Sequence, residues 1–275
     1  MNLRKCLLTK NECYQRGVKI NPVGVMVHST GANNPWLKRY VQPDDGLLGT
    51  NNNGNHWNRY RPDGRQVCVH ALIGKLADGS IATYQTLPWN YRGWHSGQGS
   101  KGSANNMGYI GFEICEDGMS DGAYFAKVYR EAVELTAYLC KMFGFNPLAD
   151  GKVICHSEGH KRGIASNHAD VMHWFPKHGK SMDTFRADVA AEMNKTTTEE
   201  DVDINKLLQD MTDEQAYLIY QKAVQHMVTL PEPEWSQKEG AWKKAQETGV
   251  MDGTSPERPL KRDEFAAVLD RKGLL

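Results

Sequence analysis

The chain has 275 residues, and its 33 Lys and Arg balance its 33 Asp and Glu, so the formal net charge is zero. Charged residues make up 24% and hydrophobic residues 40%, an ordinary globular composition that excludes a disordered chain, a coiled coil and a collagen-like repeat. No apolar run reaches about 18 residues, so no membrane span is expected. Zero net charge also argues against nucleic-acid binding through a basic surface.

The charge is not evenly distributed along the chain. Up to Lys195 there are 23 basic and 17 acidic residues, net +6, whereas the remainder carries 10 basic and 16 acidic residues, net −6. Such asymmetry favours two modules with different partners. Residues 196–203 (TTTEEDVD) are polar, acidic and without apolar periodicity. We therefore predict a first domain over residues 1–195, a linker over 196–203 and a small helical domain over 204–275.

The N-terminal segment MNLRKCLLTKNECYQR becomes polar after two leucines, which is not the pattern of a secretory signal. We expect a chain that is synthesised in the cytoplasm without a signal peptide. The six cysteines are scattered without C-x-x-C spacing, so reduced and mostly buried thiols are expected.

Apolar runs and helical periodicity alternate in the first domain. A turn at residues 77–79 separates two runs and predicts a hairpin. The predicted fold class is α/β, with a mixed central sheet flanked by helices, followed by a small all-α C-terminal domain. In chain order, we expect strands over residues 23–28, 66–73, 80–85 and 109–115, a helix over 123–143, a strand over 153–155, and helices over 183–194, 204–228, 236–248 and 260–271.

Three long segments rich in Gly and Asn are expected to be loops, at residues 31–55, 90–108 and 157–180. Long ordered loops in a compact domain are usually functional. Their aromatic and hydrogen-bonding groups suit a carbohydrate-like or peptide-like ligand. In HSEGH (156–160), Gly159 and the following KRG argue against a helix.

Two histidines follow predicted strands at their carboxyl ends: His28 after VGVMV and His156 after VIC. In α/β folds, sites are built at the carboxyl ends of strands, so these two imidazoles could meet at one sheet edge. For either histidine alone, a polar residue that simply satisfies its hydrogen bonds at a strand end is the simpler interpretation.

Glu113 lies inside the apolar run YIGFEIC. Alternation places Ile110, Phe112 and Ile114 on one face of the strand, and Gly111, Glu113 and Cys115 on the other. A carboxylate there is costly unless it is paired or next to a metal. It is therefore either half of a salt bridge or a general base with a raised pKa.

The segment SNHADVMHWF (166–175) supplies imidazoles and a carboxylate 10–17 residues after His156. Catalytic zinc sites commonly take three His or carboxylate ligands and leave one position open. His156 and His160 are spaced like a helical zinc pair, but HSEGH is not H-E-x-x-H, which disfavours a helical metalloprotease site.

Taken in order, VMVHST, VHALIGKLADG, WHSG, NNMGYIGFEICED, ICHSEGH and HAD resemble the zinc-dependent N-acetylmuramoyl-L-alanine amidases. These share a fold with peptidoglycan recognition proteins and many phage endolysins. The resemblance covers about residues 20–190. It implies Zn²⁺ bound by His28, His156 and Asp170, with Glu113 as the catalytic carboxylate.

The sequence departs from the family at two positions. His168 stands where the family has a Lys near the scissile carbonyl, so it could stabilise the oxyanion or replace Asp170 as a ligand. Val69 stands where some members have a Tyr, so no Tyr role transfers.

The resemblance implies hydrolysis of the amide between N-acetylmuramic acid and L-alanine in bacterial peptidoglycan, in an endolysin-like enzyme that acts on the cell wall. Trp94 and His95 either contact the substrate at the cleft rim or pack within their loop, whereas His70 suits the core or a position behind the ligands. The alternatives are a non-catalytic peptidoglycan-recognition module and a zinc endopeptidase of the stem peptide.

Residues 235–275 are similar to a single partial S-layer homology repeat, a module that attaches proteins to secondary cell-wall polymers. Trp242, Thr254 and Arg262 would be the contacts. The alternative is a helical appendage for packing or dimerisation, and the net charge of −6 does not suit attraction to an anionic polymer.

Overall fold

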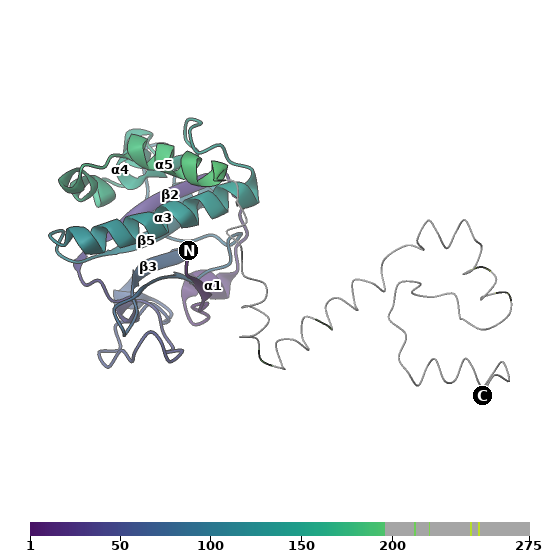
Figure 1. Cartoon of the computed structure of the whole chain (residues 1–275), viewed down its shortest axis with the longest axis vertical. Helices are drawn as coiled ribbons and strands as arrows, with labels where there is room; N and C mark the ends of the chain where they lie inside the picture. Colours follow the sequence, from purple (N-terminus) through teal and green to yellow (C-terminus); the bar gives the residue numbers. More distant parts are fainter. Residues whose placement is uncertain (196–211, 213–219, 221–242, 244–246, 248–275) are drawn as a thin grey trace. The chain divides into compact units, whose positions relative to one another are not determined.

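The computed structural model describes residues 1–195 together with Thr212, Tyr220, Lys243 and Glu247 (Figure 1). The chain divides into two compact units, Met1–Thr196 and Thr197–Leu275. The predicted linker, the helices expected at 204–228, 236–248 and 260–271 as whole elements, and Trp242, Thr254 and Arg262 lie outside the described residues and stay predictions. Within the described part of the chain, no helix combines the length and apolar character needed to cross a membrane.

The first unit is built on a six-stranded mixed sheet with strand order β1-β4-β3-β5-β2-β6. β3 and β4 form an antiparallel hairpin, and every other pair of neighbours is parallel. The predicted α/β class, the mixed sheet and the hairpin are confirmed. The strands are β1 (Leu3–Lys5), β2 (Gly24–Asn33), β3 (Ala71–Lys75), β4 (Ile81–Gln85), β5 (Tyr109–Glu116) and β6 (Val153–Cys155).

The long helices α3 and α5 cover one face of this sheet, whereas the short helices α1 and α4 contact residues of the other face. The two long helices confirm the predictions for residues 123–143 and 183–194 to within one residue, and α3 lies across the sheet (Figure 1). The helices are α1 (Glu12–Arg16), α2 (Ala104–Met107), α3 (Gly122–Phe143), α4 (His156–Lys161) and α5 (Met182–Asn194), with 3₁₀ turns η1 (Leu37–Arg39), η2 (Pro62–Gly64), η3 (Asp170–His173) and η4 (Phe175–His178).

Helix α3 begins and ends where its sequence predicts. The Asp121 side chain accepts the backbone N–H groups of Ala123 and Tyr124 at the N-terminus, and Gly144 closes the C-terminus in the left-handed conformation. The apolar stripe of the helix packs on β2 and β5 in one buried core. The alternating residues of these strands, Val25, Val27, Ile110, Phe112 and Ile114, therefore face α3.

The opposite face of the sheet is covered by loops rather than by a long helix. A second core there includes Leu72 and Tyr84 from the hairpin, Cys115 from β5, and Leu37 and Trp57 from the long connection after β2. Polar side chains that alternate with the α3-facing residues point to this side. This side therefore holds the candidate site.

Several local predictions were wrong. The segments expected to be loops contain short helical elements, such as α2 in residues 90–108 and η1 in residues 31–55. HSEGH forms α4, because the Glu158 carboxylate accepts the Cys155 N–H at 3.1 Å and Gly159 packs closely on Met26, where a Cβ would lie 2.7 Å from Met26 Cε. The strand expected at 66–73 begins only at Ala71, because Cys68 forms just an isolated bridge with Trp94. The cysteine prediction is confirmed: all six are free, and only Cys6 is not buried.

Candidate metal centre

His28 and Glu113 lie side by side on the loop-covered face of the sheet. β2 and β5 run parallel, and their register pairs His28 with Glu113. Because Val27 and Phe112 face α3, the next residue along each strand points to the other side. The prediction that Glu113 shares a face with Gly111 and Cys115 is confirmed, since Cys115 belongs to the second core and Gly111 abuts His95.

His156 and Asp170 come from the segment that follows β6. His156 is the first residue of α4, directly after the strand, and is 4% exposed. Asp170 opens the 3₁₀ turn η3 with a φ of 45°, in the left-handed region that few residues other than glycine adopt. Such backbone conformations cluster at functional sites, where the surrounding structure holds a side chain in one direction.

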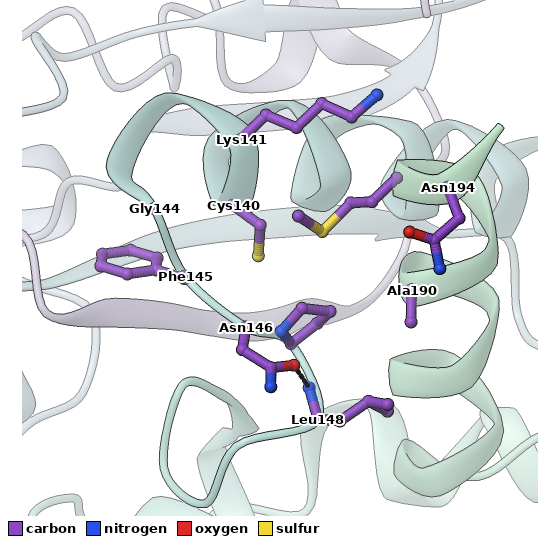
Figure 2. Close-up of a pocket in the computed structure, with 10 residues that line it drawn as sticks. Cys140, Lys141, Gly144, Phe145, Asn146, Leu148, Ala190 and Asn194 are labelled. Atoms are coloured by element: carbon purple, nitrogen blue, oxygen red, sulfur yellow. Dashed lines mark hydrogen bonds between the residues drawn. The ribbon is translucent and has the colours of Figure 1, made fainter. Parts of the chain in front are cut away.

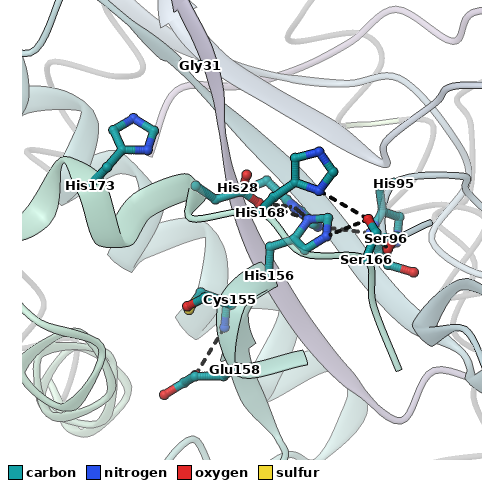
Figure 3. Close-up of polar contacts among 12 residues, drawn as sticks. His28, Gly31, His95, Ser96, Cys155, His156, Glu158, Ser166, His168 and His173 are labelled. Atoms are coloured by element: carbon teal, nitrogen blue, oxygen red, sulfur yellow. Dashed lines mark hydrogen bonds and ion pairs between the residues drawn. The ribbon is translucent and has the colours of Figure 1, made fainter. Parts of the chain in front are cut away.

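The side chains of these three residues converge on one point. Figure 3 shows the two imidazoles, His28 and His156, lying close together. His28 Nδ1 lies 2.7 Å from Asp170 Oδ2 and 3.1 Å from His156 Nδ1. The third distance, from His156 Nδ1 to Asp170 Oδ2, is 3.0 Å. Two imidazole nitrogens and one carboxylate oxygen thus form a small triangle.

This triangle fits a tetrahedral zinc ion. Zinc bonds to N and O ligands of about 2.0–2.1 Å correspond to ligand–ligand distances of about 3.3 Å, close to the edges observed. The donor set of two imidazoles and a carboxylate is one that catalytic zinc sites use, with a fourth position left for water or substrate. The residues present therefore fit the metal that the family resemblance implies.

The protonation states also favour metal binding. Burial lowers the pKa of His28, although Asp170 opposes the shift, so the imidazole tends to be neutral. Burial acts against ionisation of Asp170, but the close polar contacts with His156 and His28 outweigh burial and hold the pKa of the carboxyl well below its usual range. Neutral imidazole and ionised carboxylate are the forms that act as ligands.

Glu113 is held next to this triangle without a partner of its own. Its Oε2 is buried and has no hydrogen-bond partner, and no ion pair to it is found among the described residues. The salt-bridge alternative therefore finds no support in that part of the chain. Burial, together with the nearby Asp170 and Glu116 carboxylates, raises the pKa of Glu113 well above its ordinary value.

His168 and His160 lie outside the triangle. His168 is exposed, and its Nδ1 lies 3.1 Å from Ser166 Oγ while its ring contacts the ring of His156 at 4.8 Å between centroids. His160 is exposed on α4 and bonds through Nδ1 to the carbonyl of Ala165 at 3.2 Å. Neither residue is part of the described group that could hold a metal.

The two residues predicted at the cleft rim occupy different places. His95 lies directly behind His28, with 2.9 Å between His95 Nδ1 and His28 Nε2. Trp94 is partly buried against the second core, with Arg92 over its ring at 5.7 Å. His70, expected in the core or behind the ligands, is fully buried, and its ring lies 6.0 Å from that of His95.

Sequence reasoning missed two contacts around the triangle. Ser166 Oγ lies 3.2 Å from His156 Nε2, at the start of the SNHAD segment that already held two candidates. His173 Nε2 bonds both oxygens of the buried Glu116 at 3.0 Å, joining the end of η3 to β5. The second pair carried no sequence signal, because its two residues are 57 positions apart.

A separate pocket of about 480 Å³ lies between the C-terminal parts of α3 and α5 (Figure 2). Its lining includes Phe145, Leu148 and Met193, and none of the predicted site residues. Cys140 is the one thiol that lines it, and burial raises the pKa of this thiol to about 12. The thiol therefore stays protonated at neutral pH and is not a reactive nucleophile.

Comparison with known proteins identifies the family. The model of the N-acetylmuramoyl-L-alanine amidase family Amidase_2 matches residues 19–176, more than half of the chain and all of the segments that supply the triangle. This chain belongs to that amidase family. A curated relative, the N-acetylmuramoyl-L-alanine amidase CwlA of a Bacillus species, is 32% identical over 134 residues. The match covers 47% of this chain and 50% of CwlA, so the chain spans about half the length of that relative.

The comparison with solved structures finds a hydrolase and a catalytic domain, both with low sequence identity. The Staphylococcus aureus hydrolase AmiA, in complex with its ligand, is 21% identical, with 70% of this chain and 82% of AmiA covered at a TM-score of 0.48. The catalytic domain of XlyA is 22% identical, with 69% of this chain and 99% of that domain covered at a TM-score of 0.46.

Proposed function

We propose that this amidase-family chain hydrolyses the amide bond between N-acetylmuramic acid and L-alanine in bacterial peptidoglycan, with Zn²⁺ bound by His28, His156 and Asp170. The observation that carries the proposal is the convergence of two imidazole nitrogens and one carboxylate oxygen beside Glu113, whose Oε2 is buried without a hydrogen-bond partner. Family membership supports the same reaction.

Each residue then has a chemical role. When bound, the zinc would polarise the lactyl carbonyl as a Lewis acid and acidify a water molecule. Glu113 accepts the proton of the attacking water and passes it to the departing amine, since its raised pKa makes it a stronger base than an ordinary Glu. The hydroxide oxygen joins the lactyl carbonyl carbon, the C–N bond breaks, and L-alanine leaves with a free amino group.

His168 is proposed as the residue that stabilises the oxyanion. It is exposed next to His156, and the hydrogen bond to Ser166 holds its ring near the site. A protonated imidazole there would place positive charge near the carbonyl oxygen as that oxygen becomes negative.

The enzyme would act on the bacterial cell wall in an endolysin-like manner. The net charge of +6 over residues 1–195 suits approach to an anionic wall, an attraction that salt weakens.

Digestion of purified muropeptides, read by mass spectrometry, tests the proposal against its alternatives. An amidase releases intact stem peptides with a free L-alanine amine and leaves unsubstituted N-acetylmuramic acid. A zinc endopeptidase cuts within the stem peptide, and a recognition module leaves the muropeptide intact. The second or third result would overturn the proposed reaction.

A further inference from the structure

The two imidazoles of the triangle each use one nitrogen at the centre, and the other nitrogen points to a second layer of residues (Figure 3). His28 Nε2 meets His95 Nδ1 at 2.9 Å, and His156 Nε2 meets Ser166 Oγ at 3.2 Å. The Ser166 hydroxyl in turn lies 3.3 Å from the carbonyl oxygen of Ser96. Both connections therefore lead to the adjacent residues His95 and Ser96.

We propose that the His95–Ser96 segment is the positioning layer of the metal centre: it fixes which nitrogen of His28 and of His156 carries the proton and so presents both Nδ1 lone pairs to the metal. The inference rests on the proposed metal centre. It gives His95 a different role from the substrate contact expected at the cleft rim.

The hydrogen-bond directions between His28 and His95 follow from one acceptor, the carbonyl oxygen of Tyr109. His95 Nε2 lies 3.2 Å from the carbonyl oxygen of Tyr109, which can only accept, so Nε2 carries the proton of a neutral His95. Nδ1 of His95 then accepts, and His28 Nε2 must donate to it. The proton of neutral His28 is thereby placed on Nε2, and its Nδ1 lone pair faces Asp170 and His156.

With the proton of His156 also on Nε2, as its contact with Ser166 indicates, three electron-rich atoms lie within 3.1 Å of one another: the Nδ1 atoms of His28 and His156 and the Oδ2 atom of Asp170. Without a proton between them, such atoms repel, whereas a cation at their centre bonds to all three. The outer hydrogen bonds thus favour a metal ion over a proton at this position. Ligating histidines generally depend on such outer partners, which orient the ring and fix its tautomer.

The proton position of His156 is assigned in the same way, from its contact with Ser166. Ser96 O accepts the backbone N–H of Ser166 at 2.9 Å and lies within reach of the Ser166 hydroxyl. With its proton directed at that carbonyl, Ser166 Oγ presents a lone pair to His156 Nε2. His156 then carries its proton on Nε2 and leaves Nδ1 free for the metal.

The fold holds this segment in place from two sides. The fully buried Asn105 accepts the backbone N–H groups of His95 and Ser96 through its Oδ1, at 2.8 and 3.2 Å. On the other side, Gly111 makes room for the imidazole of His95, since a Cβ there would lie 2.5 Å from three atoms of the ring. Because only glycine at position 111 leaves this space, the backbone of β5 fixes the position of the His95 ring.

Zinc affinity, measured by competition with a chelator and without any substrate, tests the inference. His95→Leu removes the acceptor, and we expect it to weaken zinc binding about 10–100-fold. His95→Asn is smaller than His but keeps an acceptor close to the position of Nδ1, so it should recover part of the loss. Ser166→Ala should also weaken binding, whereas Ser157→Ala, whose hydroxyl contacts Cys155 Sγ, should not.

Nitrogen NMR of the zinc-loaded wild-type protein provides a second readout that does not depend on any variant folding. Protons on Nε2 of both His28 and His156, with Nδ1 unprotonated, are expected. Protons on Nδ1, or wild-type affinity in folded His95→Leu, would overturn the inference. If the wild-type protein binds no zinc, the proposed metal centre itself fails, so the two failures are distinguishable.

Discussion

His28 and Glu113 occupy paired positions on the parallel strands β2 and β5 and point to the same face of the sheet. Neighbouring strands are about 4.8 Å apart, so this register alone brings a metal ligand and a carboxyl base into one site. The two residues lie 85 positions apart in the sequence, yet their relative placement is fixed by backbone pairing at the centre of the sheet.

Replacement of Glu113 by Gln should remove the base and leave the ligands in place. Loss of general base catalysis typically costs about 10²–10⁴-fold in rate, so muropeptide hydrolysis should fall by that factor while zinc content stays at the wild-type level. Glu192→Gln is the matched control, because that carboxylate pairs with Lys195 on α5. Wild-type turnover by Glu113→Gln would show that another group is the base.

Asp170 should matter more for zinc content than His160 does. Asp170→Ala removes one corner of the triangle, whereas His160→Ala removes an exposed ring that bonds to the carbonyl of Ala165. Elemental analysis after dialysis should therefore find much less zinc in the first variant than in the second. Equal zinc in the two variants would contradict the assignment of Asp170 as the third ligand.

The activity should fall on the acid side at a pH above the ordinary range of a Glu. Burial raises the pKa of Glu113, and a base works only when it is deprotonated, so activity is lost as the pH falls through this raised pKa. A profile of kcat/KM against pH, taken with constant zinc occupancy, measures the pH at which this acid-side loss of activity occurs. An acid limb at or below about pH 4.5, the ordinary value, would contradict the prediction.

His70 should make the metal-free fold sensitive to acid. Burial lowers the pKa of His70 from 6.5 to about 4, so between these values the unfolded chain takes up a proton that the folded chain does not. Stability should therefore fall as the pH drops from about 6.5 to about 4, with a contribution from His70 of about 3 kcal/mol.

Urea unfolding measures the stability of the wild type and of His70→Gln at neutral pH and near pH 4. The comparison separates the contribution of His70 to acid sensitivity from that of the other histidines. The variant loses the hydrogen bonds of His70 to Gly111 and Tyr91, which lowers its stability at every pH. Its stability should nevertheless decline less steeply in acid than that of the wild type. Parallel declines would show that His70 does not titrate in this way.

The sequence predicted those parts of the molecule that depend on local pattern. Alternation in YIGFEIC correctly oriented Glu113, and the apolar period located α3. HSEGH was misread, because Gly159 usually disfavours a helix but here allows close packing on Met26. That contact joins α4 to β2 and has no local signature.

His95 shows the same limit within the site. WHSG looks like an exposed, glycine-rich rim, and nothing in it indicates that Gly111, on a different strand, leaves a slot for the ring. The partner of His28 is thus defined by the approach of two segments in space. Contacts of this kind form only when the strands are paired in the sheet, so local sequence patterns cannot predict them.

Hydrolysis of a purified muropeptide in heavy-oxygen water tests the central claim most directly, because it reports both the bond that breaks and the source of the new oxygen. With the zinc-loaded protein, we predict one heavy oxygen atom in the lactyl carboxyl group of N-acetylmuramic acid and an unlabelled stem peptide that begins with a free L-alanine amine. Label in a carboxyl group within the stem peptide, or no product from the zinc-loaded protein, would contradict the account.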